Sequence, residues 1–283
     1  MSSLSTPATG GPEPLLLLLD PAARQSDGES VRIAKDVLCG GADVKVAYPE
    51  SPSELDRVLS HRGRRRPVVI GSDLALQRVL QALYRQRELG TDPVGMVPVG
   101  RANELTAARA LGVPGAPVPA ARAVLSGAPR KLDLLVDDGG GVALGGVRIS
   151  GSGVRRMVGR TGGWRSLWAK LAAAEQASPL TSENGKNDHG SRIRVEADGR
   201  LLADVHRPVR LVQVTLPGGE AAGAGVMEVV VRAPGALVRT RAATVSVAGR
   251  GFGYEADGHP VGPVRTRTWT VHPGAWGLLL PAV

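Results

Sequence analysis

The sequence predicts two domains, an α/β domain built on a parallel sheet followed by a C-terminal antiparallel β-sandwich domain. Its 283 residues exceed what one ordinary core needs. Short apolar runs alternate with helical patterns up to about residue 133, and strand-like segments then follow one another. We therefore expect a disordered tail over residues 1–13, the α/β domain over 14–133 and the β-rich domain over 134–283.

The first half shows the regular alternation of strands and helices. Residues 15–19 are five consecutive leucines, which is typical of a parallel strand covered on both faces, and Asp20 with Pro21 ends the run. Further strands are expected at residues 44–48, 67–70, 95–99 and 131–135, and helices at 29–38, 53–59, 73–88, 102–111 and 119–126. This order implies a parallel sheet with helices on both faces.

The second half has the pattern of an antiparallel sheet. Asp198 and Gly199 form a preferred turn pair, so residues 192–203 are expected to make a hairpin. Other strands are expected at residues 210–216, 227–232, 243–248, 252–256 and 264–271, with a helix at 164–176 and a polar loop at 179–191.

Two glycines, each placed between an expected strand and an expected helix, suggest the chemistry. Gly71 follows the strand at 67–70, and Gly100 follows the strand at 95–99. A glycine lets an anion approach the backbone, and the N-terminus of the next helix offers unpaired N–H groups. Phosphate is therefore the first ligand to consider.

The motifs around these turns resemble those of the diacylglycerol kinase catalytic-domain family. Residues 71–75 (Gly-Ser-Asp-Leu-Ala) correspond to the family's Gly-Gly-Asp-Gly-Thr, and residues 98–104 (Pro-Val-Gly-Arg-Ala-Asn-Glu) to its Pro-x-Gly-Thr-x-Asn-Asp. Asp20 and Pro21 stand at the opening Asn-Pro, and residues 257–259 (Asp-Gly-His) at a C-terminal Asp-Gly-Glu turn. The family plan is an N-terminal ATP-binding domain followed by a β-rich lipid-binding domain, and the resemblance covers nearly the whole chain.

The resemblance implies a lipid kinase that uses ATP and Mg²⁺ to phosphorylate a lipid alcohol such as diacylglycerol. It implies Asp73 and Asp257 as catalytic carboxylates. The residues implied in nucleotide binding are Asp20, Gly71, Ser72, Gly100, Asn103 and Glu104. Simpler roles stay open for the two carboxylates, because Asp73 is also placed to be an N-cap and Asp257 to be a turn residue.

Departures from the motifs support an alternative, a catalytically impaired pseudokinase that binds a nucleotide or lipid as a regulatory module. Leu74 replaces a glycine and Ala75 a threonine hydroxyl in the first motif, while His259 replaces an acid near the C-terminus. A third alternative, an NAD-kinase-like enzyme, shares the Gly-Gly-Asp-Gly signature. The sequence of residues 111–114 (Leu-Gly-Val-Pro) favours the lipid-kinase family over it.

Composition limits the partners. The net charge of +9 favours polyanions, either an anionic membrane surface contacted peripherally or phosphorylated small molecules. Aromatic residues make up only 3% and none are interleaved with the basic residues for stacking on bases, which argues against nucleic acid. The densest basic run, residues 62–66, is either a solvated loop or a membrane-facing segment. A single cysteine and no signal-peptide pattern predict the cytoplasm.

The histidines lack metal-ligand spacing, so no protein metal site is expected from the sequence. Oligomeric state is left open by the sequence.

Overall fold

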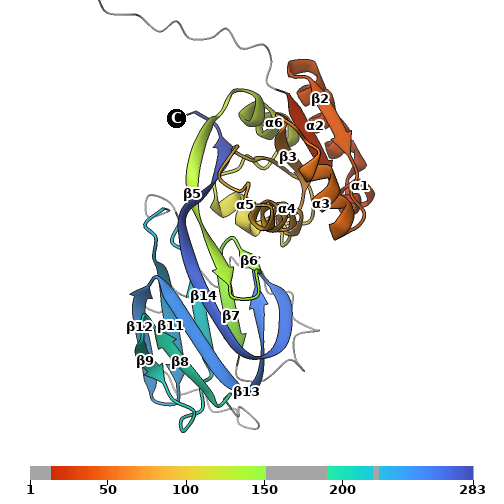
Figure 1. Ribbon diagram of the computed structural model, residues 1–283. Coiled ribbons are helices and arrows are strands. Elements are labelled where there is room, and N and C mark those ends of the chain that lie inside the picture. Colours follow the sequence, from red (N-terminus) through yellow and green to blue (C-terminus); the bar gives the residue numbers. More distant parts are fainter. Residues whose placement is uncertain (1–13, 151–189, 219–222, 283) are drawn as a thin grey trace, which may run out of the picture.

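The structure is a computed structural model that describes residues 14–150, 190–218 and 223–282 (Figure 1). The expected tail at 1–13, the helix at 164–176 and residues 179–189 of the expected loop lie outside the described residues. The described part has an α/β lobe and a β lobe, as the sequence predicts.

The N-terminal lobe is built on a parallel sheet in the order β2-β1-β3-β4. Its strands are β1 (Leu15–Leu19), β2 (Val44–Ala47), β3 (Arg66–Gly71) and β4 (Gly95–Pro98). Its helices are α1 (Pro21–Ser26), α2 (Gly28–Gly41), α3 (Pro52–Ser60), α4 (Asp73–Arg85), α5 (Thr106–Ala110) and α6 (Pro117–Ser126).

The leucines of β1 alternate between two apolar cores, as expected for a strand covered on both faces. Leu16 and Leu18 pack in the core formed with α3, α4 and α5. Leu15 and Leu17 pack in the core formed with α1, α2 and α6. The sheet is thereby covered on both sides, and its strand ends are the accessible edges.

The C-terminal lobe is one antiparallel sheet whose path is β12-β11-β10-β7-β13-β14-β5-β6, with β8 added to β13 and β9 to β8. Its strands are β5 (Ala128–Asp137), β6 (Val142–Ala143), β7 (Gly146–Ser150), β8 (Ile193–Ala197), β9 (Arg200–Ala203), β10 (Leu211–Thr215), β11 (Met227–Ala233), β12 (Ala236–Ala242), β13 (Thr244–Ala256) and β14 (His259–Leu280). Side chains from nine of these strands enclose a single apolar core that includes Tyr254 and Trp269. The antiparallel β-rich class of this lobe is thus confirmed.

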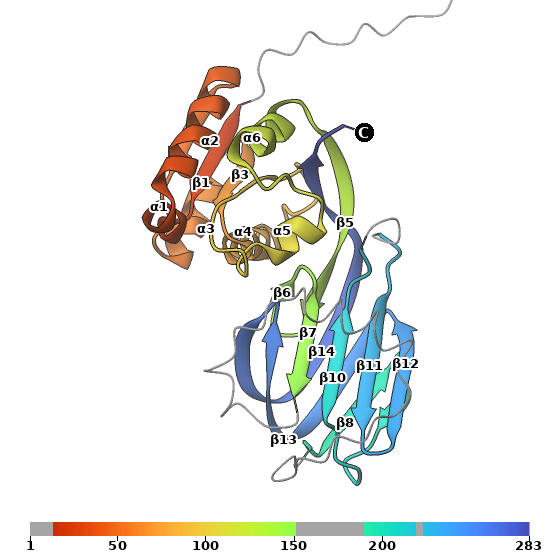
Figure 2. The ribbon, with the colours of Figure 1, turned by 180° about the vertical axis from the view of Figure 1, so that it is seen from behind.

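Two long strands, β5 and β14, connect the lobes (Figures 1 and 2). They pair antiparallel from Trp269 opposite Asp137 to Leu280 opposite Ala128. The end of β14 then joins the parallel sheet beside β4, because the N–H of Val94 donates to the carbonyl of Gly277 at 2.7 Å. Residues near the end of the chain therefore belong to the N-terminal core. We propose a domain division near residue 134 in which residues 275–280 return to the first domain.

Several elements differ from the sequence prediction. The helix expected at 102–111 is reduced to α5, because residues 101–104 form a tight turn in which the Glu104 carboxylate accepts from the N–H of Arg101 at 2.9 Å. Strand β12 was not expected, and β14 is longer than predicted. The length of β14 is explained by pairing with the distant β5, which local periodicity does not report. Strand β12 pairs with its sequence neighbour β11 in a tight hairpin with Ala233 opposite Ala236.

The returning end of β14 provides a test of the shared core. Leu278 is fully buried among residues of α4 and β4, so Leu278→Ala should lower the free energy of unfolding by about 2–5 kcal/mol. The matched control is Leu237 on β12, which is 51% exposed. Leu237→Ala should change the free energy of unfolding by less than about 0.5 kcal/mol. Urea denaturation checks both, and equal effects would contradict the shared core.

Candidate phosphate-binding cleft

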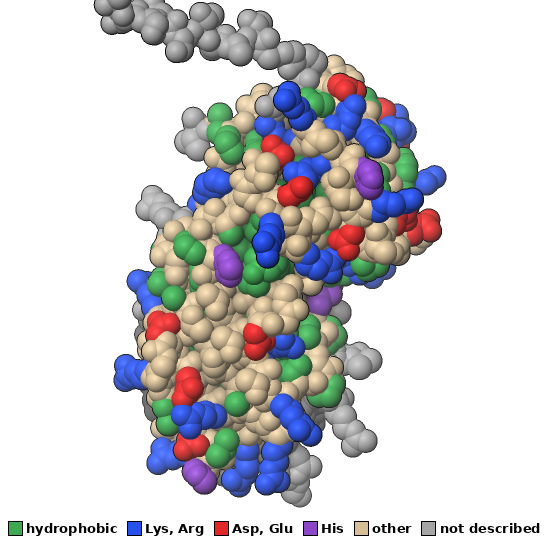
Figure 3. Space-filling model, in the orientation of Figure 1, with side chains coloured by type: hydrophobic (Ala, Val, Ile, Leu, Met, Phe, Trp, Pro, Cys, Tyr) green, Lys and Arg blue, Asp and Glu red, His purple; other side chains and the backbone are tan. Residues whose placement is uncertain are grey.

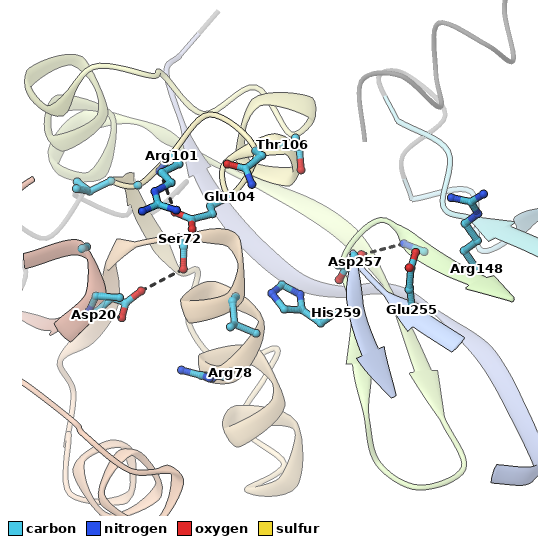
Figure 4. A pocket seen from close by; sticks show the side chains of 18 of the residues that line it. Asp20, Ser72, Arg78, Arg101, Glu104, Thr106, Arg148, Glu255, Asp257 and His259 are labelled. Atoms are coloured by element: carbon cyan, nitrogen blue, oxygen red, sulfur yellow. Dashed lines mark hydrogen bonds between the residues drawn. The ribbon is translucent and has the colours of Figure 1, made fainter. Parts of the chain in front are cut away.

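A cleft of about 780 Å³ lies where the two lobes meet (Figure 4). The N-terminal lobe contributes the turns that follow β1, β3 and β4, and the C-terminal lobe contributes β7, β10 and the β13–β14 turn. Of the residues predicted from sequence, six line this cleft: Asp20, Ser72, Gly100, Asn103, Glu104 and Asp257. Gly71 and Asp73 lie behind its wall.

The first two turns are tied together by a side-chain bond. Because β1 and β3 are parallel neighbours, the residues after them meet at the same edge of the sheet. The hydroxyl of Ser72 donates to the carboxylate of Asp20 at 3.1 Å. A Cβ at Gly71 would lie only 2.5 Å from the Cβ of Asp20. Glycine at position 71 is therefore required by the close approach of Asp20.

Asp73 has a role in the fold that differs from the one expected. Ser72 is the N-cap of α4 and accepts from the N–H of Ala75 at 3.4 Å, so the N-cap role predicted for Asp73 in its own helix is wrong. The Asp73 carboxylate instead accepts from the N–H groups of Ala107 at 2.7 Å and Ala108 at 2.9 Å. It thereby holds the start of α5. Burial raises the pKa of Asp73, opposed by these two donors, and the charge of Asp257 raises it further.

The second glycine turn is closed by Glu104. Its carboxylate accepts from the N–H of Arg101 at 2.9 Å, and its carbonyl accepts from the N–H of Asp73 at 2.9 Å. Gly100 has a φ of +154°, and a Cβ there would lie 3.1 Å from the Glu104 carboxylate. An acidic side chain thus lies against the glycine that is expected to face phosphate.

Asp257 lies on the opposite side of the cleft, at the turn between β13 and β14 (Figure 4). Its φ of +48° shows the turn conformation. Its carboxylate accepts from three successive N–H groups, those of Leu144 at 2.6 Å, Gly145 at 2.8 Å and Gly146 at 3.0 Å. Burial raises the pKa of Asp257, while the three donors and the neighbouring His259 oppose the shift.

Basic side chains line the same cleft. Arg78 on α4, Arg101 after β4 and Arg148 on β7 each reach it, and the structure gives their guanidinium groups no ion-pair or hydrogen-bond partner among the described residues. The Nδ1 atom of His259 is buried and also lacks a partner there. These residues were missed or given little weight by the sequence reasoning, since no local motif marks them. Only the fold brings them together.

The fit of the implied cofactors can be judged from these donors. Within the described ranges, no group of three or more His, Cys, Asp or Glu side chains is arranged to hold a metal ion. The carboxylates of Asp73 and Asp257 are already bonded to backbone N–H groups. The described side chains therefore form no all-protein cage for Mg²⁺, and an ion held between nucleotide phosphates would need one or two of the carboxylates that line the cleft. Arg78 and Arg101, which come from the N-terminal lobe and have no ion-pair partner among the described residues, do fit the phosphates of ATP.

The basic run at residues 62–66 lies away from the cleft. Arg62 is buried in ion pairs with Glu88 and Asp92, and Arg65 pairs with Asp43 at 3.0 Å. The run enters β3 at its N-terminal end, and the cleft lies at the other end, about 20 Å away along six residues. On the face shown in Figure 3, Lys and Arg side chains are spread over both lobes. No helix among the described residues is long and apolar enough to cross a membrane.

Comparison with known proteins agrees with the fold and with the N-terminal motifs. Residues 14–136 match the family described as the diacylglycerol kinase catalytic domain, which confirms the resemblance seen in the sequence. No curated protein matches the chain.

Solved structures from Bacillus anthracis str. Sterne extend the likeness to the whole chain. One, whose title suggests a diacylglycerol kinase, is 14% identical with a TM-score of 0.73, and the match covers 98% of each chain. Another, titled a diacylglycerol kinase, is also 14% identical with a TM-score of 0.68, over 95% of this chain and 97% of that one. At this identity the likeness shows the fold.

The pH dependence of stability tests the environment of Asp257. A carboxyl whose folded pKa is raised above the ordinary 3.8 contributes stability that is present below the unfolded pKa and lost as pH rises through the folded pKa. The free energy of unfolding of the wild type minus that of Asp257→Asn should therefore decrease as pH rises from about 3.5 to 7.

Asp198→Asn, in the similar but exposed turn at Asp198-Gly199, controls for altering an Asp-Gly turn. Urea denaturation across this pH range gives the comparison. A difference that increases with pH would show that the three N–H donors outweigh burial at Asp257.

Proposed function

We propose that the protein is a lipid kinase-like module that binds ATP in the cleft between its lobes and is impaired in phosphoryl transfer. In the family that the chain resembles, the acceptor of the phosphoryl group is a lipid alcohol such as diacylglycerol. The observation that carries the proposal is the bonding of the signature turns, where several N–H groups have acceptors within the chain itself. We also propose the cytoplasm as its location, with peripheral contact to anionic membrane.

Four N–H groups around the two signature turns and the turn after β1 have internal acceptors. Ala22 donates to the Asp20 carboxylate at 3.1 Å, and Ala75 to the Ser72 hydroxyl at 3.4 Å. Arg101 donates to the Glu104 carboxylate and Asp73 to the Glu104 carbonyl, both at 2.9 Å. Phosphoryl transfer depends on such donors being aimed at the phosphates and on neutralising Mg²⁺. With these four donors engaged, binding through arginines is favoured over transfer.

A second candidate is an active lipid kinase, and a specific observation favours it. Asp73 and Asp257 lie near enough for the charge of Asp257 to raise the pKa of Asp73. The chain also retains Gly71, Gly100 and Asn103 in the positions of the family motifs. A cleft with a carboxylate on each side has the components to orient an attacking hydroxyl.

A nucleotide titration beside a phosphate-transfer assay separates the two functions. Under the proposal, ATP binds the full chain saturably, and transfer of its γ-phosphate to a panel of lipid alcohols stays at the level of an Asp257→Asn variant. Sustained transfer that disappears in Asp257→Asn would overturn the impaired-module proposal and establish the active kinase. Failure of ATP to bind would overturn both.

Glu104 gives a sharper test of the blocked turn. Glu104→Ala frees the N–H of Arg101 and removes a negative charge beside Gly100, so ATP affinity should rise roughly tenfold, the equivalent of one hydrogen bond to a charged phosphate. The matched control is Glu29→Ala, which removes the same charge from the exposed surface of α2 and should leave affinity unchanged. Isothermal titration measures both, and equal affinities in the two variants would show that Glu104 does not block phosphate.

Restoring the family residues tests the first turn in the same assay. Ser72→Gly, Leu74→Gly and Ala75→Thr together remove the Ser72 acceptor, clear a side chain that lines the cleft and supply a hydroxyl. ATP affinity should rise roughly tenfold, because a hydrogen bond to charged phosphate is recovered. The start of α4 should be weakened by about 1 kcal/mol through the added glycines. Unchanged ATP affinity in a folded variant would mean that this turn does not hold phosphate.

A further inference from the structure

The C-terminal wall of the cleft has a polar surface that the nucleotide does not explain. Gln213 on β10, Arg148 on β7 and Glu255 on β13 are direct neighbours across three antiparallel strands. Residues in such register point to the same face of the sheet, with Cβ atoms about 4.5–5.5 Å apart. Thr215, two residues beyond Gln213, lies on the same face opposite Gly146. All of these residues line the cleft.

Several polar side chains of this surface have no partner in the protein. Gln213 is 5% exposed and Thr215 is 6% exposed, whereas Arg148 is exposed. None of these three side chains has a hydrogen-bond or ion-pair partner among the described residues. Their polar atoms are not fully enclosed, so they open into the cleft and are available to a ligand.

Gly146 is fixed by the close approach of β7 and β10. A Cβ at this position would lie 2.0 Å from the carbonyl oxygen of Val214, so the fold requires glycine here. Gly146 lines the cleft together with Thr215 and Asp257. His259, whose Nδ1 is buried without a partner among the described residues, completes the rim beside Asp257 (Figure 4).

The residue types define the chemistry of the ligand. The planar guanidinium of Arg148 matches a phosphate group. The amide of Gln213 and the hydroxyl of Thr215 both donate and accept, and the carboxylate of Glu255 accepts, which suits adjacent hydroxyl groups. An alkyl chain would leave all four groups desolvated and unpaired. The wall is therefore unsuited to an acyl chain.

We propose that this wall binds a phosphorylated polyol, a phosphate group carried next to free hydroxyls, as the acceptor-side ligand of the cleft. The inference deepens the proposed function, since it concerns the other half of the same cleft, but it does not require ATP to bind. The ligand is either a soluble polyol phosphate or the head group of an anionic phospholipid. Both present the same groups to the wall, a phosphate next to free hydroxyls.

Titration of the full chain without nucleotide tests the site, using sn-glycerol 3-phosphate, inorganic phosphate and glycerol as probes. Glycerol 3-phosphate should bind saturably and about tenfold more tightly than inorganic phosphate, because the hydroxyl contacts add to the phosphate contact. Glycerol alone should bind more weakly than glycerol 3-phosphate and should not reach the same stoichiometry. Equal affinity for glycerol 3-phosphate and inorganic phosphate would overturn the proposal.

Variants assign the binding to the wall. Arg148→Gln should weaken glycerol 3-phosphate about tenfold or more, since a charged hydrogen bond is lost, and Thr215→Val about threefold. Arg239→Gln is the matched control. Arg239 is an exposed arginine on the same face of the sheet, but it lies on edge strand β12 outside the cleft. This variant should change the affinity for glycerol 3-phosphate by less than about twofold. Circular dichroism confirms folding of each variant. Equal effects of Arg148→Gln and Arg239→Gln would overturn the proposal even if Thr215→Val does not fold.

Vesicles distinguish the two sources of the ligand. Phosphatidylcholine vesicles containing phosphatidylglycerol, which presents a phosphate beside two hydroxyls, are compared with vesicles holding the same fraction of phosphatidylserine. Preference for phosphatidylglycerol that is lost in Arg148→Gln supports a lipid head group. Saturable binding of glycerol 3-phosphate without that preference supports a soluble ligand. Equal binding to both vesicles with no effect of Arg148→Gln on any probe would overturn the site, whereas failure of ATP alone to bind would overturn only the proposed function.

Discussion

The pairing of β5 with β14 is the constraint on which the rest of the structure depends. These two strands leave the parallel sheet together and continue into the antiparallel sheet, so they set the position of one lobe relative to the other. Trp276 and Leu278, near the end of the chain, pack in the core of the first lobe. The buried carboxylate of Asp133 strengthens the crossing, because it accepts from the N–H groups of Gly225 and Gly274 at 2.9 and 2.8 Å. The cleft exists because this connection brings β7 and β13 opposite the turns after β1, β3 and β4.

Much of the fold was predictable from sequence because its signals are local. Five leucines in succession, with helices on either side, indicate a strand buried on both faces, and the structure divides those leucines between two cores. Turn signals at Asp198-Gly199 and Asp257-Gly258 likewise agree with the observed hairpins. The return of β14 to β4 was not predictable, since a strand's pattern of burial does not identify its partner. Strand β12 was missed although its signal is local, since it forms a tight hairpin with β11 through the turn at Pro234 and Gly235.

The candidate site was predictable in part. Glycine turns and the aspartates beside them can be located by motif, and six of the eight residues chosen line one cleft. The role of Asp73 could not be read from its own neighbourhood, because its carboxylate caps α5, more than thirty residues away. The unpaired Gln213, Thr215 and Arg148 carry no motif. Only strand register places them side by side.

The erosion of the motifs and the internal bonding of the turns have one physical explanation. Backbone N–H groups at the start of a helix need an acceptor, which can be a side chain, water or a ligand. In this chain the acceptors are the side chains that depart from the family: Asp20, Ser72 and Glu104 each bond an N–H group at a strand-to-helix turn. A phosphate bound to these N–H groups would compete with the carboxylate or hydroxyl that now accepts from them. Side-chain guanidinium groups avoid that competition, which is why the arginines around the cleft are the groups best placed to make the first contact with an anion.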